Sequence, residues 1–296
     1  MPSRRYDHDD DDRPRTRHRH RDDDDRDDRR RRRKHKKSGA SPAVILGGIG
    51  GGLLLLGGAA VAAFFLLRDK PAPSASPTAF PDMVAHWSFE EAPGERIPDM
   101  TKRGNTGVVA AGRLGPGVKG HGFWLDGRDD QYIDLSKAKE LNFADGTEFT
   151  IAAWFQTQEK VGTIVSFRHT ELPSQVDLFV RDNRAIGIVG DDADTTGEHA
   201  FCWCKVPNDG NWHHVALTRS GRKIELYYDG AFQDVHAANH SGGPITTNMR
   251  AIGCERMFVE TNERRFGRPG FKGGIDEVYV FSRALPVQEI QALMKR

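Results

Sequence analysis

The chain has 296 residues, and its 43 Lys and Arg nearly balance its 42 Asp and Glu, for a formal net charge of +1 at pH 7. That total averages three unlike segments. Residues 1–37 hold 16 basic residues and 11 Asp, residues 43–67 carry no charge, and the sequence from Asp82 onward has an ordinary globular composition with a net acidic balance. These segments exclude a single soluble globule and a basic nucleic-acid-binding domain in the folded part. Only three Cys exclude a disulfide-dense miniprotein.

The first segment lacks the apolar surface that would offset the entropy of ordering it, so residues 1–42 are expected to be a disordered charged tail. His18 and His20 have a spacing that can bind a metal weakly, although a solvated tail is the simpler interpretation. The basic run Arg29–Lys37 directly precedes an apolar segment. This position favours anionic lipid as its partner and makes nucleic acid unlikely.

Residues 43–67 predict a transmembrane helix. Thirteen of the 25 residues are Leu, Ile, Val or Phe, and the rest are Gly and Ala. A helix of this length spans about 37 Å, enough to cross a hydrocarbon core of about 30 Å. Basic residues crowd the N-terminal side, whereas only Arg68 and Lys70 follow the span, so the N-terminus is expected to be cytoplasmic. Residues 68–81 are rich in Pro, Ala and Ser and predict an extended linker.

In residues 82–296 the hydrophobic pattern mostly has a period of two, as in β-strands. Residues 149–156, 212–218, 223–228 and 275–281 predict strands, and pairs such as Asp229-Gly230 mark turns between them. Residues 149–156 are apolar on both faces, which predicts a central strand covered on both sides. Pro286 and the apolar spacing after it predict a C-terminal helix. Many short strands separated by turns indicate an all-β sandwich.

Five sequence blocks in this region, taken in order, resemble those of the laminin-G-like, concanavalin A-like jelly-roll family. The blocks are 86–91, 123–135, 149–155, 210–230 and 271–285, and they cover nearly all of the region. The resemblance implies an all-β concanavalin A-like jelly-roll sandwich over residues 82–296. It also implies a module outside the cell that binds glycans or proteins, since families of this kind are mostly binding modules.

Catalytic chemistry finds little support in the sequence. A related jelly-roll branch contains glycosidases with a Glu-x-Asp-x-Glu motif, which is absent here. Glu90-Glu91 and Asp276-Glu277 are adjacent pairs, so on a strand their side chains point to opposite faces. The same holds for His213 and His214. We therefore expect no enzymatic activity.

The resemblance implies a calcium site. The stretch from Asp99 to Gly107 looks like a family loop that can hold calcium together with an acidic residue of the last strand, here Asp276. Asp99, Asn105 and Asp276 are the expected ligands, because calcium prefers oxygen donors. The alternative is that Asp99 caps a turn, and the charges of Lys102 and Arg103 depart from the family pattern.

The cysteines and tryptophans give two further expectations. Cys202 and Cys204 share one strand face, so one of them is expected to bond Cys254, as Cys204–Cys254 or Cys202–Cys254. The family blocks imply that four tryptophans pack in the core: Trp87, Trp124, Trp154 and Trp212. Trp203 lies outside the blocks, where it either is buried or occupies an edge strand, or else stacks on a sugar.

Together these features predict a single-pass cell-membrane protein with its large C-terminal domain outside the cytoplasm. The leading expectation is non-catalytic binding of a carbohydrate or an extracytoplasmic protein. The alternative is a structural or signalling scaffold whose charged tail recruits a cytoplasmic partner. The loop 255–268 is long enough to cover part of a sheet face, as a binding edge or by ordinary loop variation.

Overall fold

The structure is a computed structural model that describes residues 80–91, 94–138, 140–256 and 268–295. The predicted tail 1–42, the predicted span 43–67 and most of the linker 68–81 lie outside these ranges. No helix in the described ranges is long and apolar enough to cross a membrane. The chain divides into two units, Met1–Ser74 and Ala75–Arg296, and the fold below is that of the second unit.

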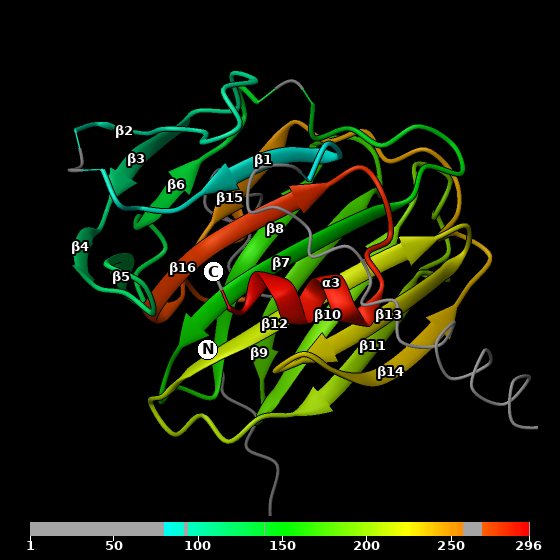
Figure 1. The fold of residues 1–296 in the computed structure, drawn as a ribbon. Helices are drawn as coiled ribbons and strands as arrows, with labels where there is room; N and C mark the ends of the chain where they lie inside the picture. Colours follow the sequence, from blue (N-terminus) through cyan, green and yellow to red (C-terminus); the bar gives the residue numbers. More distant parts are fainter. Residues whose placement is uncertain (1–79, 92–93, 139, 257–267, 296) are drawn as a thin grey trace, which may run out of the picture. The chain divides into compact units, whose positions relative to one another are not determined.

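The described strands form two antiparallel sheets (Figure 1). Sheet A runs in the order β14 (Ala231–Ala237), β13 (Lys223–Tyr228), β12 (Trp212–Ser220), β7 (Phe149–Gln156), β16 (Lys272–Phe281), β5 (His121–Asp126) and β4 (Arg113–Pro116), and β1 (Met83–Trp87) pairs with β16. Sheet B runs in the order β11 (Ala200–Lys205), β10 (Arg184–Gly190), β9 (Gln175–Arg181), β8 (Val161–Arg168), β15 (Met249–Ile252), β6 (Tyr132–Asp134), β3 (Gly107–Ala111) and β2 (Arg96–Ile97). This arrangement confirms the all-β sandwich.

The core lies between the two sheets and follows from the alternation. Along β7, Phe149, Ile151, Ala153 and Phe155 enter one buried cluster with residues of both sheets. Trp87 on β1 belongs to the same cluster and is fully buried. β7 is flanked by β12 and β16, which confirms that residues 149–156 form a central strand.

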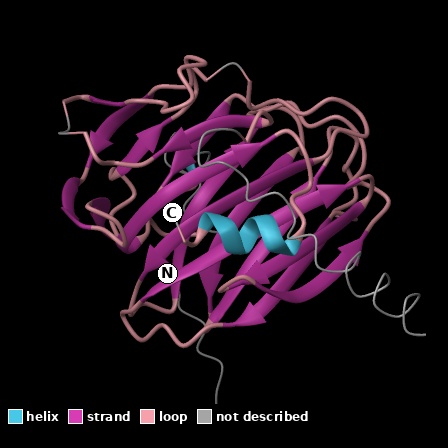
Figure 2. Ribbon diagram, in the orientation of Figure 1, coloured by secondary structure: helices cyan, strands magenta, loops and turns pink. Residues whose placement is uncertain are grey.

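The helix α3 (Val287–Leu293) covers part of the outer face of sheet A (Figure 2). Its Ile290 and Leu293 pack on outward-facing residues that include Ala152 of β7 and Tyr279 of β16. Burying each of these two aliphatic side chains contributes about 1.5–3 kcal/mol. The helix is confirmed, although Pro286 occupies the N-cap rather than the first helical position. β4 and β5 contribute no residue to the cluster under α3.

The outer face of sheet B carries a buried group of four charged residues. Asp177 of β9 has no solvent exposure and accepts hydrogen bonds from Arg168 (2.6 Å), Arg268 (2.7 Å) and the Ser166 hydroxyl (2.7 Å). Glu255 pairs with both arginines, at 2.9 and 2.8 Å. The two arginines hold the pKa of Asp177 below its usual value against the opposing effect of burial. Burial and the neighbouring Asp177 raise the pKa of Glu255 to about 7. Each acid thus contacts both arginines.

Candidate functional site

One row of residues crosses the outer face of sheet A on five neighbouring strands. The strand registers place Trp212 of β12 opposite Gln156 of β7, Gln156 opposite Gly274 of β16, Gly274 opposite Trp124 of β5, and Trp124 opposite Arg113 of β4. Facing residues on adjacent strands lie on the same side of a sheet. The row therefore presents two indoles, an amide and a guanidinium on one face, and we call it the tryptophan row.

Gly274 allows the two indoles to meet. A Cβ atom at this position would stand 2.6 Å from Cη2 of Trp212 and 3.1 Å from Cε2 of Trp124. The two rings are 6.2 Å apart at their centroids and nearly perpendicular, with an interplanar angle of 83°. The Trp124 ring is further fixed because its Nε1–H donates to the carbonyl of Pro116 at 3.0 Å. The absence of a side chain in the middle strand thus shapes this surface.

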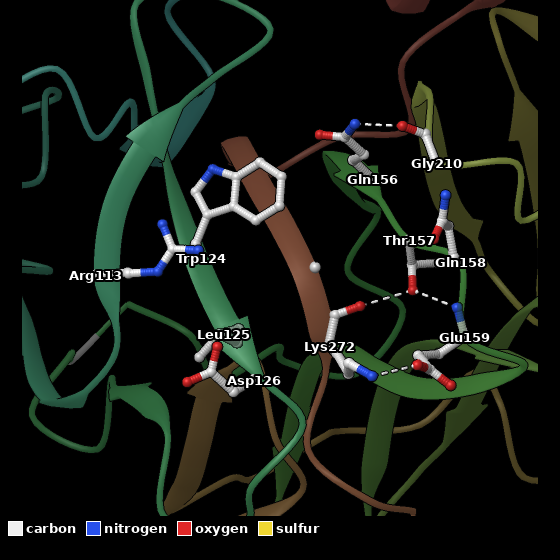
Figure 3. A pocket seen from close by; sticks show the side chains of 11 residues that line it. Arg113, Trp124, Leu125, Asp126, Gln156, Thr157, Gln158, Glu159, Gly210 and Lys272 are labelled. Atoms are coloured by element: carbon white, nitrogen blue, oxygen red, sulfur yellow. Dashed lines mark hydrogen bonds and ion pairs between the residues drawn. The ribbon is translucent and has the colours of Figure 1, made fainter.

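Two hollows, each of about 380 Å³, share Arg113, Trp124 and Gln156. The first extends toward Asp126, Thr157, Glu159 and Lys272, and Figure 3 shows its side chains around a space beside Trp124. The remaining residues of the second hollow are Pro116 and Trp212. Hollows of about 300–1,000 Å³ that combine apolar surface with a few polar groups are typical of small-ligand sites.

The polar groups of the first hollow are held by hydrogen bonds. Gln156 Nε2 donates to the carbonyl of Gly210, and Thr157 Oγ1 donates to the carbonyl of Lys272 at 2.7 Å. The Lys272 ammonium binds the Glu159 carboxylate at 2.6 Å, and this pairing raises the pKa of Lys272. Both members of this ion pair are largely exposed. Lys272 and Glu159 therefore form a surface ion pair in the lining of the hollow.

Three of the four tryptophans expected in the core do not pack there. Trp124, Trp154 and Trp212 are partly exposed on the outer face of sheet A, and only Trp87 is buried between the sheets. The alternation already carried this signal, because Phe123 and Leu125 face the core and so turn Trp124 outward. Trp203 is 38% exposed on the edge strand β11, one of its predicted environments.

The predicted calcium ligands do not form a cation site as they stand. Asp99 is nearly buried and accepts hydrogen bonds from the backbone N–H groups of His86 (3.2 Å), Thr101 (3.0 Å) and Asn105 (3.1 Å), and from the Thr101 hydroxyl (2.7 Å). This is the turn-capping alternative.

Asp276 lies on β16 and accepts from the backbone N–H groups of Val118 (2.9 Å), Lys119 (3.2 Å) and Glu277 (2.8 Å). N–H donors direct partial positive charge at both carboxylates and so occupy the positions that a cation would take. In the described part of the chain, no three His, Cys, Asp or Glu residues are placed to hold a metal ion. Asn105 is buried as well, and its Nδ2 donates to the carbonyl of Val84 at 2.9 Å, whereas its Oδ1 has no hydrogen-bond partner in the described ranges. Because both carboxylates are held by N–H and O–H donors, the three residues do not fit calcium in this arrangement.

The predicted disulfide is wrong for this structure. Cys202, Cys204 and Cys254 are all buried and free. Cys202 and Cys204 lie on β11 at one edge of sheet B, and Cys254 follows β15, four places along the sheet order. Strands spaced about 4.8 Å apart put these positions about 19 Å from one another. A disulfide requires Cα atoms within about 7 Å.

His213 and His214, adjacent on β12, have different surroundings. His213 binds Asp229 (2.9 Å) and Asp209 (3.2 Å), whereas His214 points to the opposite face and is fully buried. Burial lowers the pKa of His214 to about 4 and raises the pKa of Asp276 to about 7. Asp276 has no solvent exposure.

Comparison with known proteins decides the family. The family model Laminin_G_3, described as the concanavalin A-like lectin/glucanases superfamily, matches residues 126–291, more than half of the chain. The chain belongs to this superfamily. No curated protein matches its sequence.

Solved structures share the fold at low identity. The binding domain of Paraclostridial Mosquitocidal Protein 1 is 16% identical with a TM-score of 0.55, over 72% of this chain and 52% of that one. Domain 4 of AbnA, a GH43 extracellular arabinanase from Geobacillus stearothermophilus solved with arabinotriose, is 19% identical with a TM-score of 0.52, over 72% of this chain and 98% of that one. The binding domain of botulinum neurotoxin DC, solved with rat synaptotagmin II, is 13% identical with a TM-score of 0.52, over 72% and 51%.

The chain spans about half the length of the two toxin domains and nearly all of the arabinanase domain. At these identities the likeness shows the fold alone.

Proposed function

We propose that this protein is a non-catalytic carbohydrate-binding protein that holds its ligand on the tryptophan row. The observation that carries the proposal is the meeting of Trp124 and Trp212 over Gly274, beside the Arg113 guanidinium and the Gln156 amide. Sugars combine apolar C–H faces with hydroxyl groups, and aromatic rings beside hydrogen-bonding side chains complement both. The arabinanase domain solved with arabinotriose supports the choice of ligand class.

The same proposal includes a membrane anchor. Residues 43–67 would cross the cell membrane once, residues 1–42 would lie in the cytoplasm, and the linker 68–81 would hold the jelly roll off the surface. The basic run Arg29–Lys37 would contact anionic lipid.

A protein ligand is the second candidate, and a different surface favours it. Four apolar side chains are exposed where β11 and β14 meet: Phe201, Trp203, Phe232 and Val235. Phe201 and Trp203 face out of sheet B, and Phe232 and Val235 face out of sheet A, so both faces expose apolar surface at this edge. Exposed apolar surface of this kind marks protein interfaces. The botulinum domain solved with synaptotagmin II shows that this fold also accommodates a protein partner.

A glycan array probed with the purified full-length chain tests the two candidates. The variants Trp124→Ala and Trp203→Ala remove one indole from each surface. We expect binding to a defined glycan that Trp124→Ala weakens by about 30-fold, the scale of an interface hot spot, and that Trp203→Ala leaves unchanged. Silence of the folded wild type on the array, or loss of binding with Trp203→Ala only, would contradict the proposed site.

A further inference from the structure

The two hollows of the tryptophan row differ in charge. Asp126, Glu159 and Lys272 line the first hollow in addition to Arg113, so its charges balance. The lining of the second hollow is Arg113, Pro116, Trp124, Gln156 and Trp212, in which Arg113 supplies the sole formal charge. With the shared Arg113 counted in each hollow, the first has two acids and two bases, and the second has one base and no acid.

Arg113 differs from the arginines of the described ranges that form ion pairs, and like Arg181 and Arg184 it lies over an aromatic ring. Arg168, Arg268 and Arg283 each pair with carboxylates of the chain. Arg113 has no carboxylate partner in the described ranges, and its guanidinium carbon lies 5.6 Å from the centre of the Trp124 ring. An arginine that stacks on an aromatic ring keeps N–H donors free for a planar anion. Figure 3 shows Arg113 beside Trp124 at the edge of the hollow.

The acids at the adjacent β4–β5 turn do not neutralise this charge. Asp276 is buried and accepts from the backbone N–H groups of Val118 and Lys119. Glu90 accepts from the backbone N–H of His121 at 3.3 Å. Both carboxylates therefore hold the turn in place.

We propose that the tryptophan row binds an acidic oligosaccharide whose carboxylate pairs with Arg113 in the second hollow. The ring that carries the carboxylate packs against Trp124 and Trp212, and a neutral neighbouring sugar fills the first hollow. Two connected hollows of similar size suit a ligand of at least two sugar units. This inference rests on the proposed function and names its ligand class.

The test measures the affinity of the full-length chain for carboxylate-bearing oligosaccharides and for their carboxyl-reduced counterparts, which keep the backbone and lose the charge. We expect reduction to weaken binding by about tenfold or more, since hydrogen bonds to charged groups exceed neutral ones. Arg113→Gln should remove this preference, and Arg113→Lys should retain part of it because it keeps the charge and loses the planar fork. Raising the salt concentration should weaken binding of the acidic ligand only.

Arg184→Gln is the matched control, because Arg184 also stacks on an exposed tryptophan, at 4.3 Å from the Trp203 ring. It should leave every affinity unchanged. Equal affinity of the wild type for acidic and reduced ligands would overturn this inference and leave the proposed function standing. No binding to either ligand, nor to any neutral glycan on the array, would overturn both.

Discussion

Two groups of charged residues, one on each outer face of the sandwich, are built in opposite ways. On sheet B, Asp177 and Glu255 are buried and each meets Arg168 and Arg268, so every charge has a partner within the chain. On sheet A, Arg113 stacks on a partly exposed indole with no carboxylate partner in the described ranges. A buried and compensated cluster serves the fold, whereas an uncompensated charge beside aromatic rings is available to a ligand. The predictions below test this division.

The largest effect is expected from breaking the cluster on sheet B. Asp177→Ala leaves Arg168 and Arg268 with one acid between them, and removing one partner of a buried ion pair destabilises by about 3–5 kcal/mol. Urea unfolding of the variant and the wild type measures the difference. Glu140→Gln, which breaks the half-exposed pair with Arg103, is the control and should change stability by less than about 1 kcal/mol. Equal effects of the two variants would refute the structural role of the cluster.

A pH-dependent effect is expected from His214, which lies two residues from Trp212 on the same strand face. In the described ranges neither ring nitrogen has a hydrogen-bond partner. Burial lowers its pKa from 6.5 to about 4. The folded state therefore binds fewer protons than the unfolded state between these values, so stability is complete above pH 6.5 and falls as the pH drops toward 4.

The size of this loss is about 3 kcal/mol, at 1.36 kcal/mol per pKa unit. His214→Phe should remove it, and comparing the unfolding free energies of the variant and wild type at several pH values isolates the contribution. His236→Gln, at a partly exposed histidine, is the control. An unchanged slope below pH 6.5 in His214→Phe would show that another group titrates there.

Gly274→Ala tests whether the tryptophan row binds the ligand. The added Cβ would stand 2.6 Å from Trp212 and displaces the indoles without entering the core between the sheets. We expect glycan affinity to fall by about tenfold, the equivalent of about 1.4 kcal/mol. Gly94→Ala adds a Cβ with no atom within 4 Å and should bind as the wild type does. An unaltered affinity of Gly274→Ala would contradict the proposal that the ligand binds on the two indoles.

The cysteines are expected to contribute no crosslink. Burial raises the pKa of Cys202 and Cys204 to about 12, so the native thiols should react slowly. Titration with a thiol reagent should count no fast-reacting group in the native protein and three after unfolding without reductant. A count of one free thiol after unfolding would show that two of the three cysteines form a disulfide.

Calcium is expected to have the smallest effect. The donors around Asp99 and Asp276 are N–H and O–H groups, so calcium and EDTA should give the same midpoint of thermal unfolding. A rise of several degrees in calcium, lost in Asp99→Asn, would place an ion there after all.

Alternation and turn residues were enough to predict the sandwich and its central strand, and Pro286 with the apolar spacing after it was enough to predict the C-terminal helix. The tryptophan row was missed because the family blocks suggested a core position for every tryptophan in them, although the alternation of Phe123, Trp124 and Leu125 already turned the indole outward. Its pairing with Arg113 depends on the β4–β5 register, and the disulfide failed because the order of strands in sheet B separates the cysteines. Register and strand order arise from long-range pairing, which a local pattern does not encode.

The indole N–H resonances of the five tryptophans, followed during titration with the glycan best bound on the array, test the central claim most directly. The account predicts that the signals of Trp124 and Trp212 shift on binding and that those of buried Trp87 and edge-strand Trp203 stay in place. A shift of Trp203 with Trp124 and Trp212 unmoved would contradict the account and assign the ligand to the edge formed by β11 and β14.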